Sequence, residues 1–422
     1  MLNAKQEREL CYLIKVDDIK PIEGKDFTEC AVVGGWTIMV RKGQFQPGDI
    51  GIYFEVDSKV PETEPFLFLA AKHYKIKTQK YKTPSGHFYS QGLLMHPEDF
   101  GFETYIDGDG TQYVHINGKS HCVEDETRFL TKELGVTYAE AEDNTRKANS
   151  DPNAKYKAMA ARHPKLFKKP WVRWMMKRDW GKKIMFFFFG KKKDKKNEKS
   201  FPTHLKYIQK SDEERCENIP FILQDKDEWI KTTKIDGTSS LYLMERKGKK
   251  FEYWVCSRNI RQLNRNQECY HQDNVYWEVN DKYKIEEALI DLLNKHTEWD
   301  YVAIQGETAG CSSSGAKIQG DPHKFGELRF FAYNFITSDK GRWNSLDGEK
   351  MLLKYNIPWV PIVDAHYILP DSFEEFKRSA DGPCEALGAS GDREGFVYRR
   401  FNAVEGKINS FKNVSNEYLL EH

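Results

Sequence analysis

Three marks of other protein classes are missing from this 422-residue sequence. Its eight cysteines form no C-x-x-C pair, which argues against a zinc site and a disulfide framework and fits a reducing compartment. The run of four phenylalanines at 186–189 is far too short to span a bilayer. The first residues contain no apolar stretch of the signal-peptide kind. We therefore expect a protein of the cytoplasm or another reducing compartment, neither secreted nor in a membrane.

An overall excess of charge is also missing, but the net charge of +1 hides a segregation. Residues 163–199 hold 14 Lys or Arg against 3 Asp or Glu, so the remainder of the chain is acidic. Trp171, Trp174 and Trp180 lie among these cations. Interleaved cations and aromatics suit contact with a phosphate backbone. A solvated insert without any partner explains the composition equally well.

The pattern of apolar residues divides the chain into three parts. Residues 1–118 contain short alternating segments with regular turns, which predict a five-stranded OB-like barrel that binds nucleic acid. A basic and aromatic face could come from Lys72, His73, Tyr74, Lys75, Lys77, Lys80, Tyr81 and Lys82. An ordinary polar strand pair explains these residues as well. Residues 119–200 read as a helical and basic insert or linker, helix-prone from Val123. Residues 201–422 predict an α+β domain built on antiparallel sheets.

Three helices are expected in the last part, the weakest of them marked by Met351, Leu352 and Leu353. Ser211-Asp212-Glu213-Glu214 has the pattern of a capping box and predicts a short helix that ends near Asn218. The apolar residues at 285, 288, 289, 292 and 293 recur at helical spacing and predict a second helix.

The chemistry centres on Lys234-Ile235-Asp236-Gly237, which follows an alternating segment at 228–233. It predicts a strand end and a tight turn, since glycine accepts unusual backbone angles and lets a ligand approach closely. Taken alone, this segment is equally a solvated hairpin with a surface lysine.

Five later strand-like segments carry polar residues without an obvious structural purpose. They are Ser257-Arg258-Asn259, Gln305-Gly306-Glu307, Tyr333-Asn334, Arg393-Glu394-Gly395 and Ser410-Phe411-Lys412. One such charge in an apolar segment is usually a salt-bridged core residue. Five of them after a Lys-x-Asp-Gly turn indicate a single site.

In order and spacing, these segments resemble motifs I, Ia, III, IIIa, IV and V of the covalent nucleotidyltransferases, the ATP-dependent ligases and GTP-dependent capping enzymes. The N-terminal barrel, Ser90-Gln91-Gly92-Leu93-Leu94 and the segment at 210–215 resemble more narrowly the RNA ligases that carry an N-terminal OB module. That family seals nicks between a 3′-OH and a 5′-phosphate. The resemblance implies an α+β fold, an OB-like β-barrel followed by a nucleotidyltransferase domain with an ATP-grasp-like antiparallel sheet.

The resemblance also implies a role for each motif residue. Lys234 would attack the α-phosphate of ATP to form lysyl-AMP, which requires an amine pKa lowered by a metal and by Lys412. Lys412 would also neutralise charge on that phosphate. The implied nucleotide-binding set is Thr233, Lys234, Asp236, Gly237, Arg258, Glu307, Tyr333, Glu394 and Lys412, with Tyr333 stacking on adenine and Arg258 holding the ribose or an RNA end. The implied ligands for Mg²⁺ or Mn²⁺ are Asp236, Glu307 and Glu394.

Two departures from the family pattern leave questions open. Some RNA ligases have a second lysine two residues before the motif V lysine, where this chain has Ser410, so the charge would come from Lys407 or a metal. Motif IIIa often ends in Phe-Asp and is Tyr333-Asn334 here. We expect a monomeric ATP-dependent RNA ligase that acts on nicked duplexes with an RNA 3′-OH strand. Its expected role is in RNA repair. The alternatives are a capping-type guanylyltransferase and a non-catalytic nucleic-acid-binding protein with a relict ligase domain.

Removing residues 163–199 should weaken RNA binding, because fewer cations release fewer counterions from the phosphate backbone. The loss should depend on salt and be largest at low salt. Titrating a nicked RNA duplex into the full chain and the deletion variant at two salt concentrations measures it. Equal affinities at low salt would contradict a role for the insert in RNA binding.

Overall fold

A computed structural model of the protein describes residues 1–3, 7–123, 127–139, 169, 172, 175, 178, 208, 212–258, 263–265 and 273–421. The basic insert predicted at 163–199 lies outside these residues except at four positions, and Ser211 and Asn259 also lie outside them. The chain forms two compact units. One comprises residues 1–56, 77–131 and 199–422, and the other comprises 57–76 and 132–198. None of the described helices is long and apolar enough to cross a membrane.

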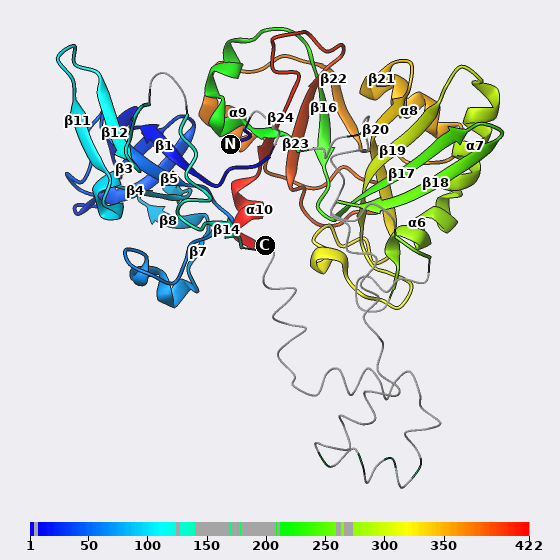
Figure 1. The fold of residues 1–422 in the computed structure, drawn as a ribbon, viewed down its shortest axis with the longest axis horizontal. Helices are drawn as coiled ribbons and strands as arrows, with labels where there is room; N and C mark the ends of the chain where they lie inside the picture. Colours follow the sequence, from blue (N-terminus) through cyan, green and yellow to red (C-terminus); the bar gives the residue numbers. More distant parts are fainter. Residues whose placement is uncertain are drawn as a thin grey trace. The chain divides into compact units, whose positions relative to one another are not determined.

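The N-terminal strands form the small β-structure expected from the sequence (Figure 1). One sheet has the order β1-β5-β10, from β1 (Cys11–Lys15), β5 (Ile50–Phe54) and β10 (Leu93–Met95). A second has the order β2-β3-β4, from β2 (Asp18–Pro21), β3 (Thr28–Val33) and β4 (Trp36–Arg41). A hairpin pairs β8 (Gln79–Thr83) with β9 (Gly86–Ser90). Tyr12, Trp36 and Tyr53 are fully buried in the shared core.

This β-structure continues beyond residue 118. The strands β11 (Glu103–Ile106), β12 (Gln112–Ile116) and β13 (Lys119–Cys122) form a three-stranded sheet, and residue 118 lies in the turn between the last two. Further on, Leu13 N–H donates to Arg128 O, and Leu130 N–H donates to Cys11 O. Residues 128–130 therefore lie along β1. No α-helix occupies the described residues 127–139, where the sequence predicts one.

The second unit has little regular structure among its described residues. The strands β6 (Ser58–Lys59), β7 (Lys75–Ile76) and β14 (Thr137–Tyr138) form a small sheet in the order β14-β6-β7. A 3₁₀ helix, η1 (Leu67–Lys72), precedes β7.

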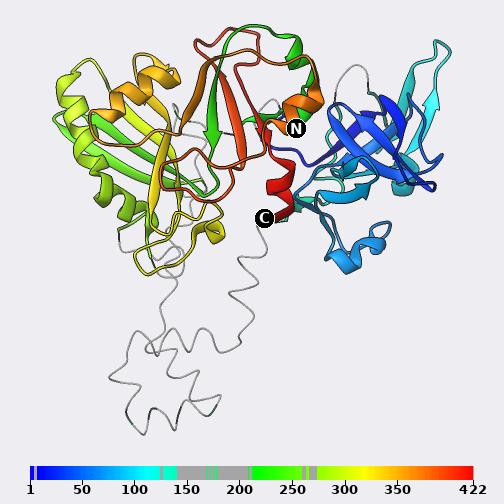
Figure 2. The ribbon, with the colours of Figure 1, turned by 180° about the vertical axis from the view of Figure 1, so that it is seen from behind.

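The C-terminal part contains two five-stranded sheets, seen from opposite sides in Figures 1 and 2. The first has the order β15-β24-β23-β16-β22, from β15 (Glu214–Arg215), β24 (Ser410–Val414), β23 (Gly395–Arg400), β16 (Trp229–Lys234) and β22 (Ile362–Tyr367). The second has the order β18-β17-β19-β20-β21, from β18 (Lys250–Ser257), β17 (Thr238–Lys247), β19 (Tyr301–Ala309), β20 (Arg329–Thr337) and β21 (Gly341–Arg342). Neighbouring strands are antiparallel except β15 and β24. The predicted α+β class with antiparallel sheets is confirmed.

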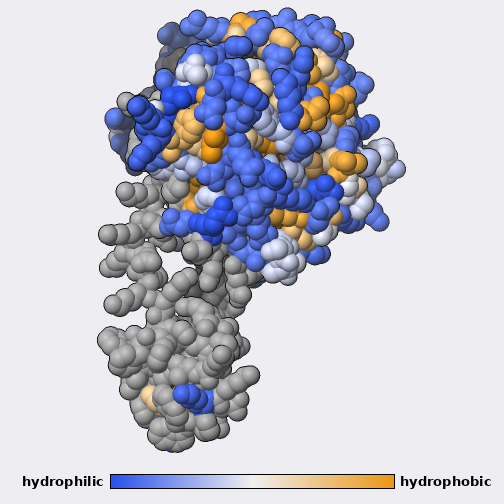
Figure 3. All heavy atoms as spheres, turned by 90° about the vertical axis from the view of Figure 1, so that its right-hand side faces the viewer, coloured by the Kyte–Doolittle hydropathy of each residue, from blue (hydrophilic) through white to orange (hydrophobic). Residues whose placement is uncertain are grey.

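Helices cover the second sheet. The helices α6 (Val275–Tyr283), α7 (Ile285–Lys295) and α8 (Ser345–Leu353) share one apolar core with its strands. All five apolar residues predicted to line α7 are buried, which confirms that helix. Two further short helices, α9 (Phe373–Arg378) and α10 (Asn416–Glu421), lie elsewhere in the chain. On the face drawn in Figure 3, apolar residues are scattered among hydrophilic ones.

Ser211 of the capping box predicted at 211–214 lies outside the described residues, and the helix predicted to begin there is wrong, although a 3₁₀ helix does end at Asn218. Glu214 and Arg215 form the strand β15, and only the 3₁₀ helices η3 (Cys216–Asn218) and η4 (Pro220–Gln224) follow. The side chains of Asp212 and Glu213 are instead bonded to residues about two hundred positions away, Lys412 and Ser410. Long-range pairing therefore outweighs the local pattern.

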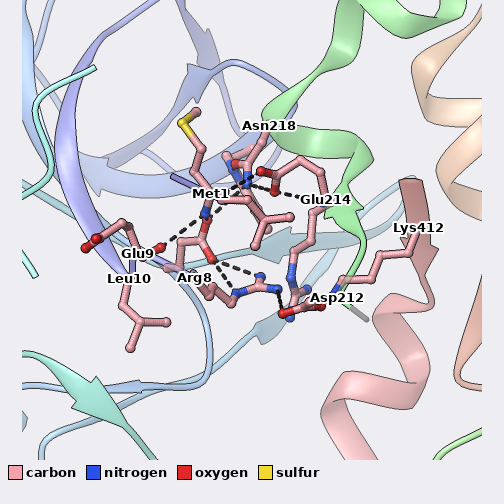
Figure 4. A network of polar contacts seen from close by, with 12 residues as sticks. Met1, Arg8, Glu9, Leu10, Asp212, Glu214, Asn218 and Lys412 are labelled. Carbon is pink, nitrogen blue, oxygen red and sulfur yellow. Dashed lines mark hydrogen bonds and ion pairs between the residues drawn. The ribbon is translucent and has the colours of Figure 1, made fainter. Parts of the chain in front are cut away.

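Asn218 joins the N-terminal strands to the C-terminal domain (Figure 4). Its Oδ1 accepts from Trp36 Nε1 at 2.7 Å and from Tyr12 Oη at 3.0 Å. Its Nδ2 donates to Glu55 at 3.0 Å and to Glu214 at 2.7 Å. The amide therefore uses its full hydrogen-bonding capacity, and Tyr12, Trp36 and Glu55 are buried.

Asn218→Leu should destabilise the protein by about 2–4 kcal/mol, because it removes four hydrogen bonds and leaves the buried indole N–H of Trp36 without its acceptor. Thermal or urea unfolding measures the effect. Asn402→Leu, at an exposed position, is the matched control and should change stability by less than about 0.5 kcal/mol. Equal stability of the two variants would show that this contact holds nothing together.

Candidate active site

The Lys-x-Asp-Gly turn crosses between the two large sheets. Lys234 ends β16 in the first sheet, and Thr238 begins β17 in the second. The hairpin alternative is therefore wrong. The side chain of Lys234 is 25% exposed, and its Nζ lies 2.5 Å from Glu394 Oε2. A Cβ on Gly237 would lie 2.3 Å from Thr308 O, so close packing requires this glycine, whose φ lies outside the left-handed region.

Three carboxylates surround the Lys234 amine. Glu394 bonds it directly, and Asp236 and Glu307 are close enough to raise its pKa. Burial alone would lower the pKa of Lys234, but the three carboxylates outweigh burial and raise it above its ordinary value. The expectation of a lowered pKa is therefore wrong for the chain by itself, because anions outnumber cations around the amine.

Glu307 shows the opposite side of this imbalance. Burial, together with repulsion from Asp236 and Glu394, raises the pKa of Glu307 to about 8 despite the attraction of Lys234. Within the described residues, no group of three or more His, Cys, Asp or Glu is arranged to hold a metal ion. The three predicted metal ligands instead face Lys234. Their oxygen donors and excess negative charge fit a hard divalent cation.

Asp212 assembles a group of cations beside this cluster (Figure 4). Its carboxylate accepts from Lys412 Nζ at 2.7 Å and from Arg258 Nη2 at 3.3 Å, and lies 4.0 Å from Arg8. Burial, reinforced by Arg8, Lys234 and Arg215, lowers the pKa of Lys412 to about 8, although Asp212 opposes the shift. The structure thus brings Lys412 and Arg258 together, as the sequence predicted. The part played by Arg8 had no sequence signal, because it precedes the motifs by more than two hundred residues.

Tyr333 and Thr233 lie on strands next to the motif I turn. The half-buried Tyr333 on β20 bonds Ser239 Oγ through its hydroxyl at 3.0 Å. The buried Thr233 precedes Lys234 on β16, and its hydroxyl donates to Glu385 at 2.7 Å. Stacking of Tyr333 on adenine and contact of Thr233 with a nucleotide both stay predictions.

An arginine of the adjacent strand lies beside Ser410, where some RNA ligases have a second lysine. Ser410 pairs in register with Arg399 on β23, and both side chains bond the carboxylate of Glu213. Arg399 also donates to Tyr333 O at 3.1 Å. Lys407, one of the two sources proposed for the missing charge, is exposed and bonds Asp227 at 3.2 Å. Arg399 is therefore the cation bonded to the same carboxylate as Ser410.

Two residues near the turn were missed by the sequence reasoning. Asp236 N–H donates to His323 Nε2 at 2.7 Å, and His323 Nδ1–H donates to Asp392 O at 2.8 Å, which fixes a neutral ring. Burial lowers the pKa of His323, which favours this neutral form. Tyr418 Oη donates to Asp236 Oδ2 at 2.8 Å. Both residues come from distant segments without a recognisable motif, so no local pattern could have found them.

Comparisons with known proteins match two regions of this chain. Residues 227–414 match the model of the RNA ligase family, and residues 10–95 match that of an OB-fold domain. None of the curated proteins matches the chain.

Solved structures of Naegleria gruberi RNA ligase have a similar fold. A variant with AMP and Mn is 24% identical over 98% of this chain and 99% of that chain, with a TM-score of 0.65. The form with PPi is 24% identical over 99% of both chains, with a TM-score of 0.64. A variant with ATP and Mn is 23% identical over 98% of this chain and 99% of that chain, with a TM-score of 0.64. These structures show the fold, and the two family matches show an OB-fold domain at 10–95 followed by an RNA ligase domain at 227–414, as the sequence predicted.

Glu307→Gln should make metal-free protein more stable at high pH. The raised pKa means that folded Glu307 keeps its proton to about pH 8, whereas the unfolded residue loses it near pH 4.3. The free energy of unfolding should therefore fall as the pH rises between these two values, and Glu307 should destabilise the protein most above pH 8. Gln mimics the protonated form, so the variant should melt roughly 3 °C or more above the parent at pH 8.5 in EDTA, with a smaller difference at pH 5.

Glu252→Gln, an exposed position on β18, is the matched control and should leave the pH dependence of the melting temperature unchanged. If the Glu307 variant and the parent melt in parallel from pH 5 to 8.5, then Glu307 is not held in its neutral form.

Proposed function

We propose that this chain, with its OB-fold and RNA ligase domains, is an ATP-dependent RNA ligase that joins a 3′-OH to a 5′-phosphate. The observation that carries the proposal is the placement of Lys234. Its amine lies at the junction of two sheets among three carboxylates, with Lys412 and Arg258 assembled on Asp212 nearby. The similar Naegleria structures with ATP, AMP and PPi support the choice of nucleotide.

In the first step, the neutral Lys234 amine attacks the α-phosphorus of ATP. A bond forms between Nζ and this phosphorus, the bond to the bridging oxygen breaks, and pyrophosphate leaves with its electron pair. The ammonium must first lose a proton, because its pKa is raised. Glu394 Oε2, at 2.5 Å, is placed to accept that proton. Lys412 and Arg258 face the transferring phosphate as positive charges once it displaces their contact with Asp212.

Asp236, Glu307 and Glu394 would hold a divalent cation, Mg²⁺ or Mn²⁺, which supplies positive charge beside the Lys234 amine and the phosphate. Glu307 must give up its proton to serve as a ligand, since it is neutral below about pH 8 in the chain alone. The mutual repulsion of the three carboxylates costs stability, so a structural role does not explain why they lie together. Binding of a cation would explain it.

The later steps use the same residues. The RNA 5′-phosphate oxygen attacks the phosphorus of lysyl-AMP, so a new P–O–P bond forms and the Nζ–P bond breaks. The 3′-OH oxygen then attacks the 5′-phosphorus, and AMP leaves. Each step is a displacement at phosphorus, so one set of positioned cations serves all three. Tyr333 would stack on the adenine, Gly237 would admit the nucleotide, and Thr233 would border it.

The partner we propose is a nicked duplex with an RNA 3′-OH strand, bound by a monomer in a reducing compartment. The seven described cysteines are free thiols, buried or half-buried, which fits that compartment. Domain limits of 1–118, 119–200 and 201–422 stay part of the proposal. A capping-type guanylyltransferase and a relict, non-catalytic domain remain the competing functions, and covalent labelling separates the three.

Incubation with labelled ATP and Mg²⁺ should leave a covalent label on the chain, whereas labelled GTP should not. Lys234→Ala should abolish the label, because no other amine is held among the carboxylates in the described residues. Denaturing gels measure the label, and acid should release it from a phosphoramidate.

Lys231→Met, on the same strand and with its apolar stem retained, is the matched control and should keep the label. Label from GTP would indicate capping, absence of label from both nucleotides would indicate a relict domain, and a labelled Lys234→Ala would exclude the assigned nucleophile. The same preparations, offered nicks with each strand as RNA or DNA, identify which strand must be RNA.

A further inference from the structure

The short helix α10 contacts both the motif I turn and the OB-fold strands. On one side, Tyr418 Oη donates to Asp236 Oδ2 at 2.8 Å. On the other, Glu417 accepts from Lys80 Nζ on β8 at 2.6 Å and from the hydroxyl of Tyr89 on β9. Asn416 Oδ1 accepts from Gln91 Nε2 at 2.9 Å. Figure 1 shows α10 between the strands of the N-terminal structure and those of the first large sheet.

Asp236 is held both at its backbone and at its side chain. Its backbone N–H is fixed by His323, and its side chain is fixed by Tyr418. The rings of His323 and Tyr418 are stacked, with centroids 6.1 Å apart and planes at 21°. Tyr418 is 4% exposed, so its hydroxyl bonds the carboxylate in a place shielded from water. A charge-assisted hydrogen bond that is shielded from water orients a carboxylate more strongly than the same bond exposed to solvent.

The start of α10 is tied to a second candidate ligand. Ser415 N–H donates to the backbone carbonyl of Glu394 at 2.8 Å, and the Ser415 hydroxyl accepts from Tyr418 N–H at 3.1 Å. The helix therefore fixes the carboxylate of Asp236 and the backbone of Glu394 together. The contact with Lys80 is more exposed, so it holds the helix more weakly and is screened by salt.

We propose that Tyr418 is a positioning residue for the metal site of the ligase, and that the OB-fold hairpin β8–β9 sets its place through α10. The inference rests on the proposed function, because it takes Asp236 and Glu394 as the groups that hold the divalent cation. In this arrangement, the OB-fold domain acts on nucleotidyl transfer through the metal site. It does so through Lys80 and Tyr89, which place Glu417, and through Tyr418, which orients Asp236.

Tyr418→Phe keeps the ring and its stacking but removes the hydroxyl. The affinity of the metal-free protein for Mn²⁺ should fall about 10-fold, as when a residue that orients a metal ligand is lost. Electron paramagnetic resonance of the free ion measures this affinity. The Mg²⁺ concentration for half-maximal lysyl-AMP formation should rise by about the same factor, with full recovery of the rate at high Mg²⁺ and an unchanged KM for ATP.

Two variants test the connection to the OB-fold. Glu417→Gln and Lys80→Met lie away from Asp236, and each should shift Mn²⁺ binding in the same direction by about 2- to 3-fold, since an exposed ion pair contributes less than a buried hydrogen bond. Tyr355→Phe is the matched control. It removes a tyrosine–aspartate bond of 2.6 Å to Asp291, between α7 and the end of α8, and should leave Mn²⁺ binding unchanged. Melting curves establish that each variant is folded.

Parental Mn²⁺ affinity in Tyr418→Phe would overturn the positioning role, as would a loss of rate that is equal at all Mg²⁺ concentrations. Parental affinity in both Glu417→Gln and Lys80→Met would overturn the coupling to the OB-fold. These outcomes are distinct from failure of the proposed function, which would appear as a parent chain without any covalent label from ATP. Mn²⁺ titration does not depend on that label.

Discussion

The organisation of this protein depends on an imbalance of buried charge at one turn. Three carboxylates, Asp236, Glu307 and Glu394, share a single ammonium, that of Lys234, at the junction of the two large sheets. The chain limits the cost by keeping Glu307 neutral up to about pH 8 and by holding Lys234 protonated. A resting state of this kind favours incoming positive charge. The repulsion that lowers the stability of the metal-free chain would be relieved by a bound cation, and this relief would add to the affinity for it.

A second group of charges has the opposite sign. Asp212 gathers Lys412, Arg258 and Arg8, where cations outnumber the anion. A nucleotide triphosphate with its metal ion carries charges of both signs, and the two groups complement it in two adjacent places. In the mechanism that we propose, Asp212 keeps these cations together until a phosphate takes its place. The same aspartate lies in a segment that reads as a capping box in the sequence, because its true partner, Lys412, is two hundred residues away.

Local periodicity was enough to predict much of the fold and the principal lysine. The apolar spacing at 285–293 gave α7, the strand and turn pattern gave the OB-fold strands, and Lys-x-Asp-Gly gave the strand end at Lys234. The sequence could not reveal His323 or Tyr418, since each reaches Asp236 from a loop or helix without periodic character. It also could not give the direction of the Lys234 pKa, which depends on how many carboxylates converge in space. Residue types and order identify a site, whereas its electrostatics require distances.

The tight hold on Asp236 has a consequence for the ageing of the molecule. An Asp-Gly pair is prone to cyclise when the glycine nitrogen attacks the aspartyl side chain, a reaction that ends in isoaspartate and displaces the backbone. Here the side chain is bonded by Tyr418, the backbone nitrogen of Asp236 is bonded by His323, and Gly237 packs against Thr308. These contacts restrict the rotation that cyclisation requires. The fold thereby protects a chemically fragile peptide link at the position where the chain can least tolerate an altered backbone.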